Sequence, residues 1–322
     1  MTLLFLLPLT SPVSISPGLF NSGNTCYLNS LLSTLYHIPF IRRNSPPPLS
    51  AIFSTLSASK PASTLSLTTL LNIDPRLQAD ADEFFKVLQS QILPSSINDL
   101  YTGTATEFIR PISPSAQEPA SEKPVPFKDL SLPLTPNLER SLKERLTPEE
   151  ISWRKTPSLK GDYLTGLPAM LQLTLQRFAT SYNAARGVVT ITKLDNSLAF
   201  PMTMNVNSTK YTLQSVVIHK GTFNYGHYYS YVNVGLGAGG EGESWIRCDD
   251  LVVSKVEVKD MQLDATNEGR KKKFRRDYGY GGRHAAAYLL NYVKVDEIPR
   301  LYREGEGEEE GRVEEEGRGD EL

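Results

Sequence analysis

One of the two cysteines, Cys26, lies where its thiol could act as a nucleophile. It follows a Gly- and Asn-rich segment, residues 18–25 (GLFNSGNT), and opens a stretch in which leucines recur every three or four residues. Unpaired backbone N–H groups and the positive end of a helix dipole favour the thiolate over the thiol at such a position. The thiolate is the nucleophilic form, so the placement suits covalent catalysis. A cysteine at a helix start also serves as a small buried apolar residue, and other residues must decide between the two interpretations.

Two further groups with complementary chemistry lie far along the chain. His227 lies 201 residues after Cys26, and the acidic pair Asp249 and Asp250 begins 22 residues after the histidine. A Gly-rich stretch, 235–242, separates two β-rich segments and predicts a hairpin, which brings the start of one strand beside the end of the next. Cysteine, histidine and acid then follow in the order of a papain-like triad, with a nucleophile, a general base and a carboxylate that orients the base.

Helices must position the cysteine, and the pattern of apolar residues predicts where they lie. Apolar side chains spaced at i, i+3, i+4 and i+7 predict three amphipathic helices. A fourth, shorter helix is predicted at Thr147-Pro148-Glu149-Glu150, which resembles a capping box with proline at the first helical position. The three longer helices are predicted over Cys26–His37, Asp80–Leu93 and Pro136–Leu146.

Strands must position the histidine and the acid, and they dominate the chain after residue 160. The Pro- and Ser-rich stretch 111–126 is predicted to be a linker between the helical part and the strand-rich part. Helices followed by an antiparallel sheet indicate an α+β fold. The strands are predicted over Met170–Phe178, Tyr211–Lys220, Tyr228–Val234, Ser244–Cys248, Val252–Val258 and Ala286–Val295.

Composition excludes several classes of protein. The 322 residues are 39% hydrophobic and 22% charged, which provides enough apolar material for a sizeable core. Two cysteines cannot form a disulfide scaffold or a four-cysteine zinc site, and no apolar run approaches the ~18 residues of a membrane helix. Residues 303–322 hold ten acids and three arginines, a charge of −7, which leaves +5 for residues 1–302. This modest basic excess does not indicate nucleic-acid binding, and we expect neither a nucleic-acid nor a membrane partner.

Six motifs, in order along the chain, resemble those of the ubiquitin-specific proteases. The segment GLFNSGNTCYLNSLLSTL resembles the cysteine box of that family, and YGHYYSYV followed by SWIRCDDLVVSKV resembles its histidine box. The resemblance covers residues 17–295, and six motifs in family order leave little room for chance. The other four motifs are QADADEF (78–84), FKDLSL (127–132), LQLTLQRF (171–178) and AYLLNY (287–292).

The resemblance implies a papain-like α+β fold with thumb, palm and fingers, and an antiparallel sheet. It implies a thiol-dependent deubiquitinase that hydrolyses the bond after the C-terminal glycine of ubiquitin, with ubiquitin and ubiquitinated proteins as partners. Cys26 would be the nucleophile, His227 the base and Asp249 the orienting carboxylate. Asn21 would donate to the oxyanion together with the Cys26 backbone N–H. The family pattern favours Asp249 over Asp250, and neighbouring residues on a strand point to opposite faces, so only one of the two can serve the imidazole.

Three further residues, Asp80, Glu83 and Tyr228, are implied to bind the substrate. In the family, the acids of the QQDAxEF segment contact the arginine-containing tail of ubiquitin. Asp80 and Glu83 also form a capping box at the start of an amphipathic helix. Both roles are compatible with the sequence.

Several features depart from the family pattern. Many members bind zinc through two CxxC pairs in the fingers, whereas the corresponding stretches here, 109–116 and 151–161, contain no cysteine. We therefore expect no zinc and no other cofactor. Ala79 replaces the second glutamine of QQD, Ser33 replaces another glutamine, and Cys248 takes a position usually held by an aromatic residue. Two alternatives stay open: a catalytically weak or inactive ubiquitin-binding scaffold, and a protease for a ubiquitin-like modifier.

The expected organisation is one catalytic domain over residues 17–295. An N-terminal extension, 1–16, precedes it, and an acidic, disordered tail, 296–322, follows it. We expect a monomer located in the cytoplasm, the nucleus or both. The basic run 270–276 (RKKKFRR) is either a nuclear address or a solvated run of charge.

Overall fold

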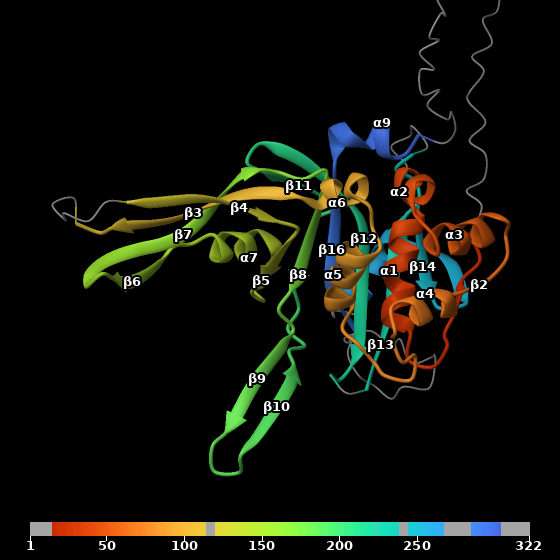
Figure 1. Ribbon diagram of the computed structural model, residues 1–322, viewed down its shortest axis with the longest axis horizontal. Coiled ribbons are helices and arrows are strands. Elements are labelled where there is room, and N and C mark those ends of the chain that lie inside the picture. Colours follow the sequence, from red (N-terminus) through yellow and green to blue (C-terminus); the bar gives the residue numbers. More distant parts are fainter. Residues whose placement is uncertain (1–14, 114–119, 224, 238–243, 267–284, 304–322) are drawn as a thin grey trace, which may run out of the picture.

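A computed structural model describes residues 15–113, 120–223, 225–237, 244–266 and 285–303 (Figure 1). Helices predominate in the described chain up to residue 101, and strands predominate after it. This order confirms the α+β class. The helices are α1 Cys26–Tyr36, α2 Pro39–Asn44, α3 Leu49–Ser57, α4 Leu65–Leu70, α5 Ala81–Gln91, α6 Ser95–Tyr101, α7 Leu138–Arg145, α8 Val258–Ala265, the 3-10 helix η2 Val295–Glu297 and α9 Ile298–Leu301.

The strands fall into one large sheet and smaller ones, and most pairs are antiparallel. In chain order they are β1 Leu19–Phe20, β2 Ala62–Ser63, β3 Gly103–Pro111, β4 Ser121–Phe127, β5 Asp129–Leu132, β6 Glu149–Trp153, β7 Thr156–Gly166, β8 Met170–Leu175, β9 Phe178–Asn183, β10 Val188–Lys193, β11 Thr203–Val206, β12 Thr209–Gly221, β13 Gly226–Asn233, β14 Trp245–Asp249, β15 Val252–Val256 and β16 Ala285–Lys294.

An eight-stranded sheet forms the centre of the molecule. Its order is β15-β14-β13-β12-β16-β8-β5, with β11 paired to β12. The last strand of the described residues, β16, therefore lies in the middle of the sheet, between β12 and β8. The predicted hairpin is confirmed, because β13 and β14 are antiparallel neighbours, with Ser230 opposite Cys248.

Apolar side chains cover both faces of this sheet. Helices α1 to α6 pack on one face, where Leu28 and Phe85 join Val217 and Leu289 of the sheet in one core. Helices α7 and α8 pack on the other face in a second core that includes Met261. Burial of apolar surface stabilises such packing by about 25 cal/mol per Å². Because α1 packs directly against β13, the start of α1 is held in place relative to that strand (Figure 1).

A second, four-stranded sheet with the order β4-β3-β7-β6 extends away from the central sheet (Figure 1). The predicted linker over 111–126 is wrong, because most of this stretch belongs to β3, β4 and their connection. Ile109 lies opposite Ser121 in an antiparallel pair. Pro124 and Pro126 fit within β4 because it is an edge strand, where a residue without an N–H group leaves no sheet hydrogen bond unmade.

The short helix predicted at residues 147–150 is also wrong. Glu149 begins strand β6, which pairs with β7, and Ile151 lies opposite Ser158. A capping box supplies only the start of a helix. The residues that follow, ISW, alternate in the strand pattern and continue the four-stranded sheet.

The folded part of the chain extends past the predicted boundary at residue 295. Leu301 and Tyr302 are only 0% and 4% exposed, and both join the core under α1 to α6. The predicted tail therefore cannot begin at residue 296. Residues 1–14, the basic run 270–276 and residues 304–322 lie outside the described residues. No helix in the described part of the chain combines the length and apolar character needed to span a membrane.

Candidate active site

Cys26 is the first residue of α1 and is buried. The segment that precedes it is fixed by the side chain of Asn21, whose Oδ1 accepts hydrogen bonds from the backbone N–H groups of Gly23 (3.0 Å) and Thr25 (3.1 Å). The backbone N–H of Asn24 donates to the carbonyl of Pro75 at 2.7 Å. The Gly- and Asn-rich composition thus gives a tight turn that presents the thiol at the helix start.

His227 and Asp249 come together at the end of the β13–β14 hairpin. Nε2 of His227 donates to Oδ1 of Asp249 at 2.6 Å. The other carboxylate oxygen, Oδ2, accepts from Nη2 of Arg247 at 2.6 Å. Cys26 forms a hydrogen bond with the same imidazole. Because Asp249 occupies Nε2, the ring nitrogen that faces the thiol is Nδ1.

Contacts within this set raise the pKa of His227 and lower the pKa of Asp249, so each contact favours the charged form of its partner. Burial lowers the pKa of His227, but the hydrogen bonds to Asp249 and Cys26 outweigh it and raise the pKa to about 10. Burial raises the pKa of Asp249, but the hydrogen bond from His227 and the charges of His227 and Arg247 outweigh it, and the net direction is down. At neutral pH the imidazole is therefore an imidazolium between a carboxylate and the thiol, and a neighbouring cation favours the reactive thiolate.

A pH profile tests this arrangement. The raised pKa of His227 means that the imidazolium persists to about pH 10, so we expect kcat/KM to fall on the alkaline side near that pH. The Asp249→Ala substitution removes a contact that raises this pKa, and it should move the alkaline limb to lower pH. The contribution of His227 to the stability of the fold depends on pH in the same direction. It is complete below the ordinary histidine pKa of 6.5 and is lost as pH rises through about 10.

The control for this profile is Asp296→Ala, which removes an exposed carboxylate from η2. It should leave the alkaline limb of the profile in place. An Asp249→Ala profile that coincides with that of the unmodified protein would show that this carboxylate does not set the protonation of His227.

Asp250 lies close to the same set, which the strand pattern did not predict. Strand β14 ends at Asp249, and Asp250 adopts a φ of 52°, so the two acids do not alternate across a strand. The expectation that Asp250 faces away is therefore wrong. Its Oδ2 accepts from Nδ2 of Asn21 at 2.9 Å, and its Oδ1 accepts from Nδ2 of Asn29 at 2.8 Å.

Together with the backbone contacts at Oδ1, the hydrogen bond to Asp250 holds the Asn21 amide at both its oxygen and its nitrogen. The Oδ1 atom accepts backbone N–H groups, and one N–H of Nδ2 donates to Asp250, so the second N–H has a defined direction. Asp250 thus orients the residue that the sequence assigns to the oxyanion. Sequence patterns hid this role because it depends on a turn conformation that non-glycine residues adopt rarely.

A double-mutant cycle tests the link between these two residues. Asn21→Ala should lower kcat by ~10²–10³-fold, which is typical for loss of one oxyanion donor. Asp250→Ala should lower kcat by less, because the amide stays but loses its orientation. If Asp250 acts through Asn21, the double variant should be no slower than Asn21→Ala alone. Full additivity of the two effects in kcat would contradict the link.

His227, Asp249 and Asp250 are also the types of residue that bind metal ions. One side-chain donor atom from each lies within 4.8 Å of the others. The hydrogen bonds described above already engage these groups with Arg247, Asn21 and one another. A metal ion at this place would have to displace those contacts.

Two of the predicted substrate-binding residues, Asp80 and Glu83, lie at the start of α5, and the third, Tyr228, lies on β13. Asp80 caps this helix, since its Oδ1 accepts from the backbone N–H groups of Asp82 (2.8 Å) and Glu83 (3.2 Å), which confirms the predicted cap. Glu83 is exposed. Tyr228 is only 3% exposed, so a substrate does not reach it directly. Its hydroxyl donates to Oδ2 of Asp80 at 3.5 Å, which makes it a support for Asp80.

Tyr288 and Arg247 also contact site residues, although neither was predicted from the sequence to do so. The hydroxyl of Tyr288 donates to Oδ2 of Asp80 at 2.6 Å. Burial and the nearby charge of Asp80 raise its pKa, so it remains a donor. Arg247 lies two residues before Asp249 on β14, and period-two spacing alone would place both on one face of the strand. No comparable pattern connects residues 80 and 288.

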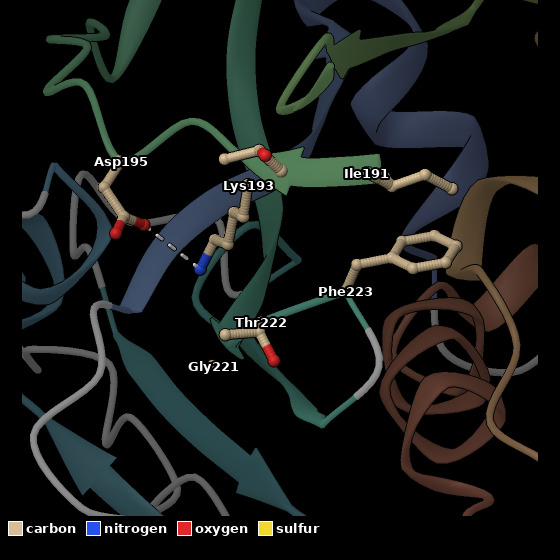
Figure 2. A pocket seen from close by; sticks show the side chains of 7 residues that line it. Ile191, Lys193, Asp195, Gly221, Thr222 and Phe223 are labelled. Carbon is tan, nitrogen blue, oxygen red and sulfur yellow. Dashed lines mark ion pairs between the residues drawn. The ribbon is translucent and has the colours of Figure 1, made fainter. Parts of the chain in front are cut away.

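A pocket of about 330 Å³ has a lining that includes none of Cys26, His227 and Asp249 (Figure 2). It adjoins the end of β12, where Lys220 pairs with His227. Burial lowers the pKa of Lys193 to about 8, and Asp195, 3.7 Å away, offsets part of this effect. The lining residues of the pocket are Ile191, Thr192, Lys193, Asp195, Gly221, Thr222 and Phe223.

Comparison with known proteins gives one consistent family. The family model described as ubiquitin carboxyl-terminal hydrolase matches residues 17–292. Similar proteins include "Ubiquitin C-terminal hydrolase 13" of Arabidopsis thaliana, which is 25% identical over 88% of this chain and 30% of its own length. "Ubiquitin carboxyl-terminal hydrolase 15" of Schizosaccharomyces pombe is 26% identical, and "Ubiquitin carboxyl-terminal hydrolase 7" of Caenorhabditis elegans is 27% identical, each over 88% of this chain and 28% of its own length.

The chain thus spans less than a third of the length of these relatives. The family match covers most of this chain, including the segment of Cys26, the helix α5 and the hairpin that carries His227 and Asp249. The chain belongs to the ubiquitin carboxyl-terminal hydrolase family.

Proposed function

We propose that this chain is a cysteine-type deubiquitinase that hydrolyses the peptide or isopeptide bond after the C-terminal glycine of ubiquitin. The observation that carries the proposal is the contact of one imidazole with Cys26 on one side and with Asp249 on the other. A nucleophile, a base and an orienting acid within hydrogen-bond reach are the requirements of this chemistry. Family membership supplies ubiquitin as the expected substrate.

The proposed fold is papain-like, with thumb, palm and fingers. Helices α1 to α6 would form the thumb and the central sheet the palm, with the catalytic set between them. The four-stranded sheet β4-β3-β7-β6 would form the fingers, since it extends from the palm as a separate sheet (Figure 1). Neither of the two cysteines lies in it.

In the proposed mechanism, the Cys26 thiolate attacks the carbonyl carbon of the terminal glycine of ubiquitin. The carbonyl oxygen becomes an oxyanion, which accepts hydrogen bonds from the Asn21 amide and the Cys26 backbone N–H. His227 then gives the proton on Nδ1 to the departing lysine amine, and a thioester remains. Water attacks this thioester with His227 as base, and the glycine carboxylate and the thiolate are released.

Asp80 and Glu83 would bind the basic tail of ubiquitin. The exposed carboxylate of Glu83 and the partly exposed one of Asp80 lie together at the start of α5. Tyr228 and Tyr288 hold the Asp80 carboxylate in place through its Oδ2 atom. An arginine side chain fits such paired carboxylates because its guanidinium offers several N–H donors in one plane.

A ubiquitin-binding scaffold without turnover is a second candidate function. The hydrogen-bonded set around His227 favours the enzyme, because binding alone requires no base beside a thiol.

We propose a location in the cytoplasm or nucleus for the active form. Both cysteines are free, and the cytosol and nucleus keep thiols reduced.

Probes with a C-terminal electrophile separate these alternatives. Ubiquitin bearing such a group should form a covalent adduct with the unmodified protein and none with Cys26→Ala. A scaffold would bind the ubiquitin probe in both proteins without forming an adduct. Matched probes made from ubiquitin-like modifiers test the third alternative, and faster labelling by one of them than by ubiquitin would reassign the substrate.

A further inference from the structure

The loop that precedes α5 contacts the chain on both sides of His227. Nε2 of Gln78 donates to the carbonyl of Gly226 at 2.6 Å, and the N–H of Gly226 donates to Oε1 of Gln78 at 3.2 Å. Two residues after Gln78, Asp80 accepts the hydroxyl of Tyr228 at 3.5 Å. The loop therefore bonds to residues 226 and 228, which flank the catalytic base.

We propose that Gln78 is a positioning residue for His227, acting through the backbone of Gly226. The inference rests on the proposed function, in which His227 is the base. A side-chain amide carries N–H donors on its nitrogen and an acceptor oxygen, and it can therefore bond to both the carbonyl and the N–H of a single residue, as a neighbouring strand would.

The pairing of β13 explains why such a partner is needed. On one side, β12 accompanies β13 as far as Gly226, which lies opposite Gly221. On the other side, the pairs with β14 extend only to Ser230, opposite Cys248. Within the described residues, the first four residues of β13 therefore pair with no strand on that side. Gln78 provides the missing hydrogen bonds at the residue before the base.

Packing on Gly226 adds a second constraint. A Cβ atom at this position would lie 2.0 Å from Nε2 of His219, so only glycine fits against that ring. His219 is 1% exposed, and burial lowers its pKa to about 3, so it stays neutral and fixed. Gly226 is thus confined between the His219 ring and the Gln78 amide. A loss of either contact would let the start of β13, and His227 with it, move.

The main test replaces Gln78 with methionine, which keeps the length of the side chain and removes both hydrogen bonds. A displacement of the base by about 1 Å can cost up to ~10²-fold in rate. We expect Gln78→Met to lower kcat for a ubiquitin–fluorophore substrate by roughly 10- to 100-fold, with KM within about twofold. Gln91→Met, the same change at an exposed site at the end of α5, is the matched control and should retain the unmodified kcat.

A second variant, Gln78→Glu, separates positioning from a general structural role. The ionised carboxylate accepts from the Gly226 N–H but repels its carbonyl, whereas the protonated form has an O–H that can donate to that carbonyl. The ratio of its kcat to that of the unmodified protein should rise as pH falls from 7.5 towards 5. The same ratio for Gln78→Met should stay flat, because methionine does not titrate in this range.

Alkylation of Cys26 by iodoacetamide at neutral pH provides a readout that does not involve ubiquitin. It should slow in Gln78→Met, because His227 is displaced from the thiol. Unchanged kcat and alkylation in Gln78→Met would overturn the proposal, and so would a rise in KM alone, which would make Gln78 a substrate contact. Absence of turnover by the unmodified protein would instead overturn the proposed function, and the alkylation rates would still decide whether Gln78 positions the pair.

Discussion

Serine in place of Cys26 should abolish hydrolysis of ubiquitin conjugates while leaving the protein folded. The two side chains differ by one atom, so the core around α1 is kept. A serine hydroxyl is not ionised by a neighbouring imidazolium, and it is a far weaker nucleophile than a thiolate. We expect kcat to fall by at least ~10⁴-fold, as for loss of the nucleophile in other triad enzymes. Hydrolysis of a ubiquitin–fluorophore conjugate measures this loss, and thermal unfolding checks the fold.

The chain supplies its own control in Cys248. This second cysteine lies on β14 and is buried, and burial raises its pKa to about 12, so it remains a thiol. Cys248→Ser should keep kcat within about twofold, because a thiol that does not ionise has no part in the attack. Normal turnover by Cys26→Ser, or equal losses in the two variants, would contradict the assignment of Cys26 as the nucleophile.

Replacement of His227 by alanine is expected to be more damaging than replacement of Asp249. His227→Ala removes the cation that stabilises the thiolate and the proton donor to the leaving amine, and general acid–base catalysis is typically worth ~10²–10⁴-fold. Asp249→Ala leaves the imidazole present but less firmly oriented, so its loss should lie at the lower end of that range. Values of kcat/KM for both variants against one ubiquitin substrate measure the difference.

Reaction with an electrophilic ubiquitin probe distinguishes the two roles further. Asp249→Ala should still form an adduct slowly, because Cys26 and His227 remain in contact. His227→Ala should react slowest at neutral pH and should gain more than the other proteins from a rise in pH. If Asp249→Ala proves the more severe change, the acid does more than orient the base, and the order of roles proposed above is wrong.

The elements that carry the chemistry were the most predictable from sequence. Helix α1 and helix α5 lie where the 3.6-residue spacing of their apolar residues placed them, because each buries one stripe against the same core. The approach of His227 to Asp249 follows from one hairpin and a Gly-rich turn. In these cases local pattern and tertiary packing require the same conformation.

Elsewhere, the conformation of the chain depends on tertiary contacts that no local sequence pattern contains. The prolines of β4 suggested a linker, but an edge position in a sheet tolerates them. Helix α3 was not predicted, because its serines and threonine weaken the local signal, although Ile52 and Phe53 bury one side of it. The position of Asp250 depends on a single φ of 52° after the end of a strand.

The central place of β16 in the sheet has a consequence for how the protein is made. Cys26 leaves the ribosome long before His227, but the strand that joins β12 to β8 is the last one of the described residues. Until residues 285–294 have emerged, the sheet has a gap between its two halves, and Leu301 and Tyr302 must follow to complete the core under α1. Domains fold as units during synthesis, so the nascent chain should acquire its thiol activity only when synthesis of this domain is nearly complete.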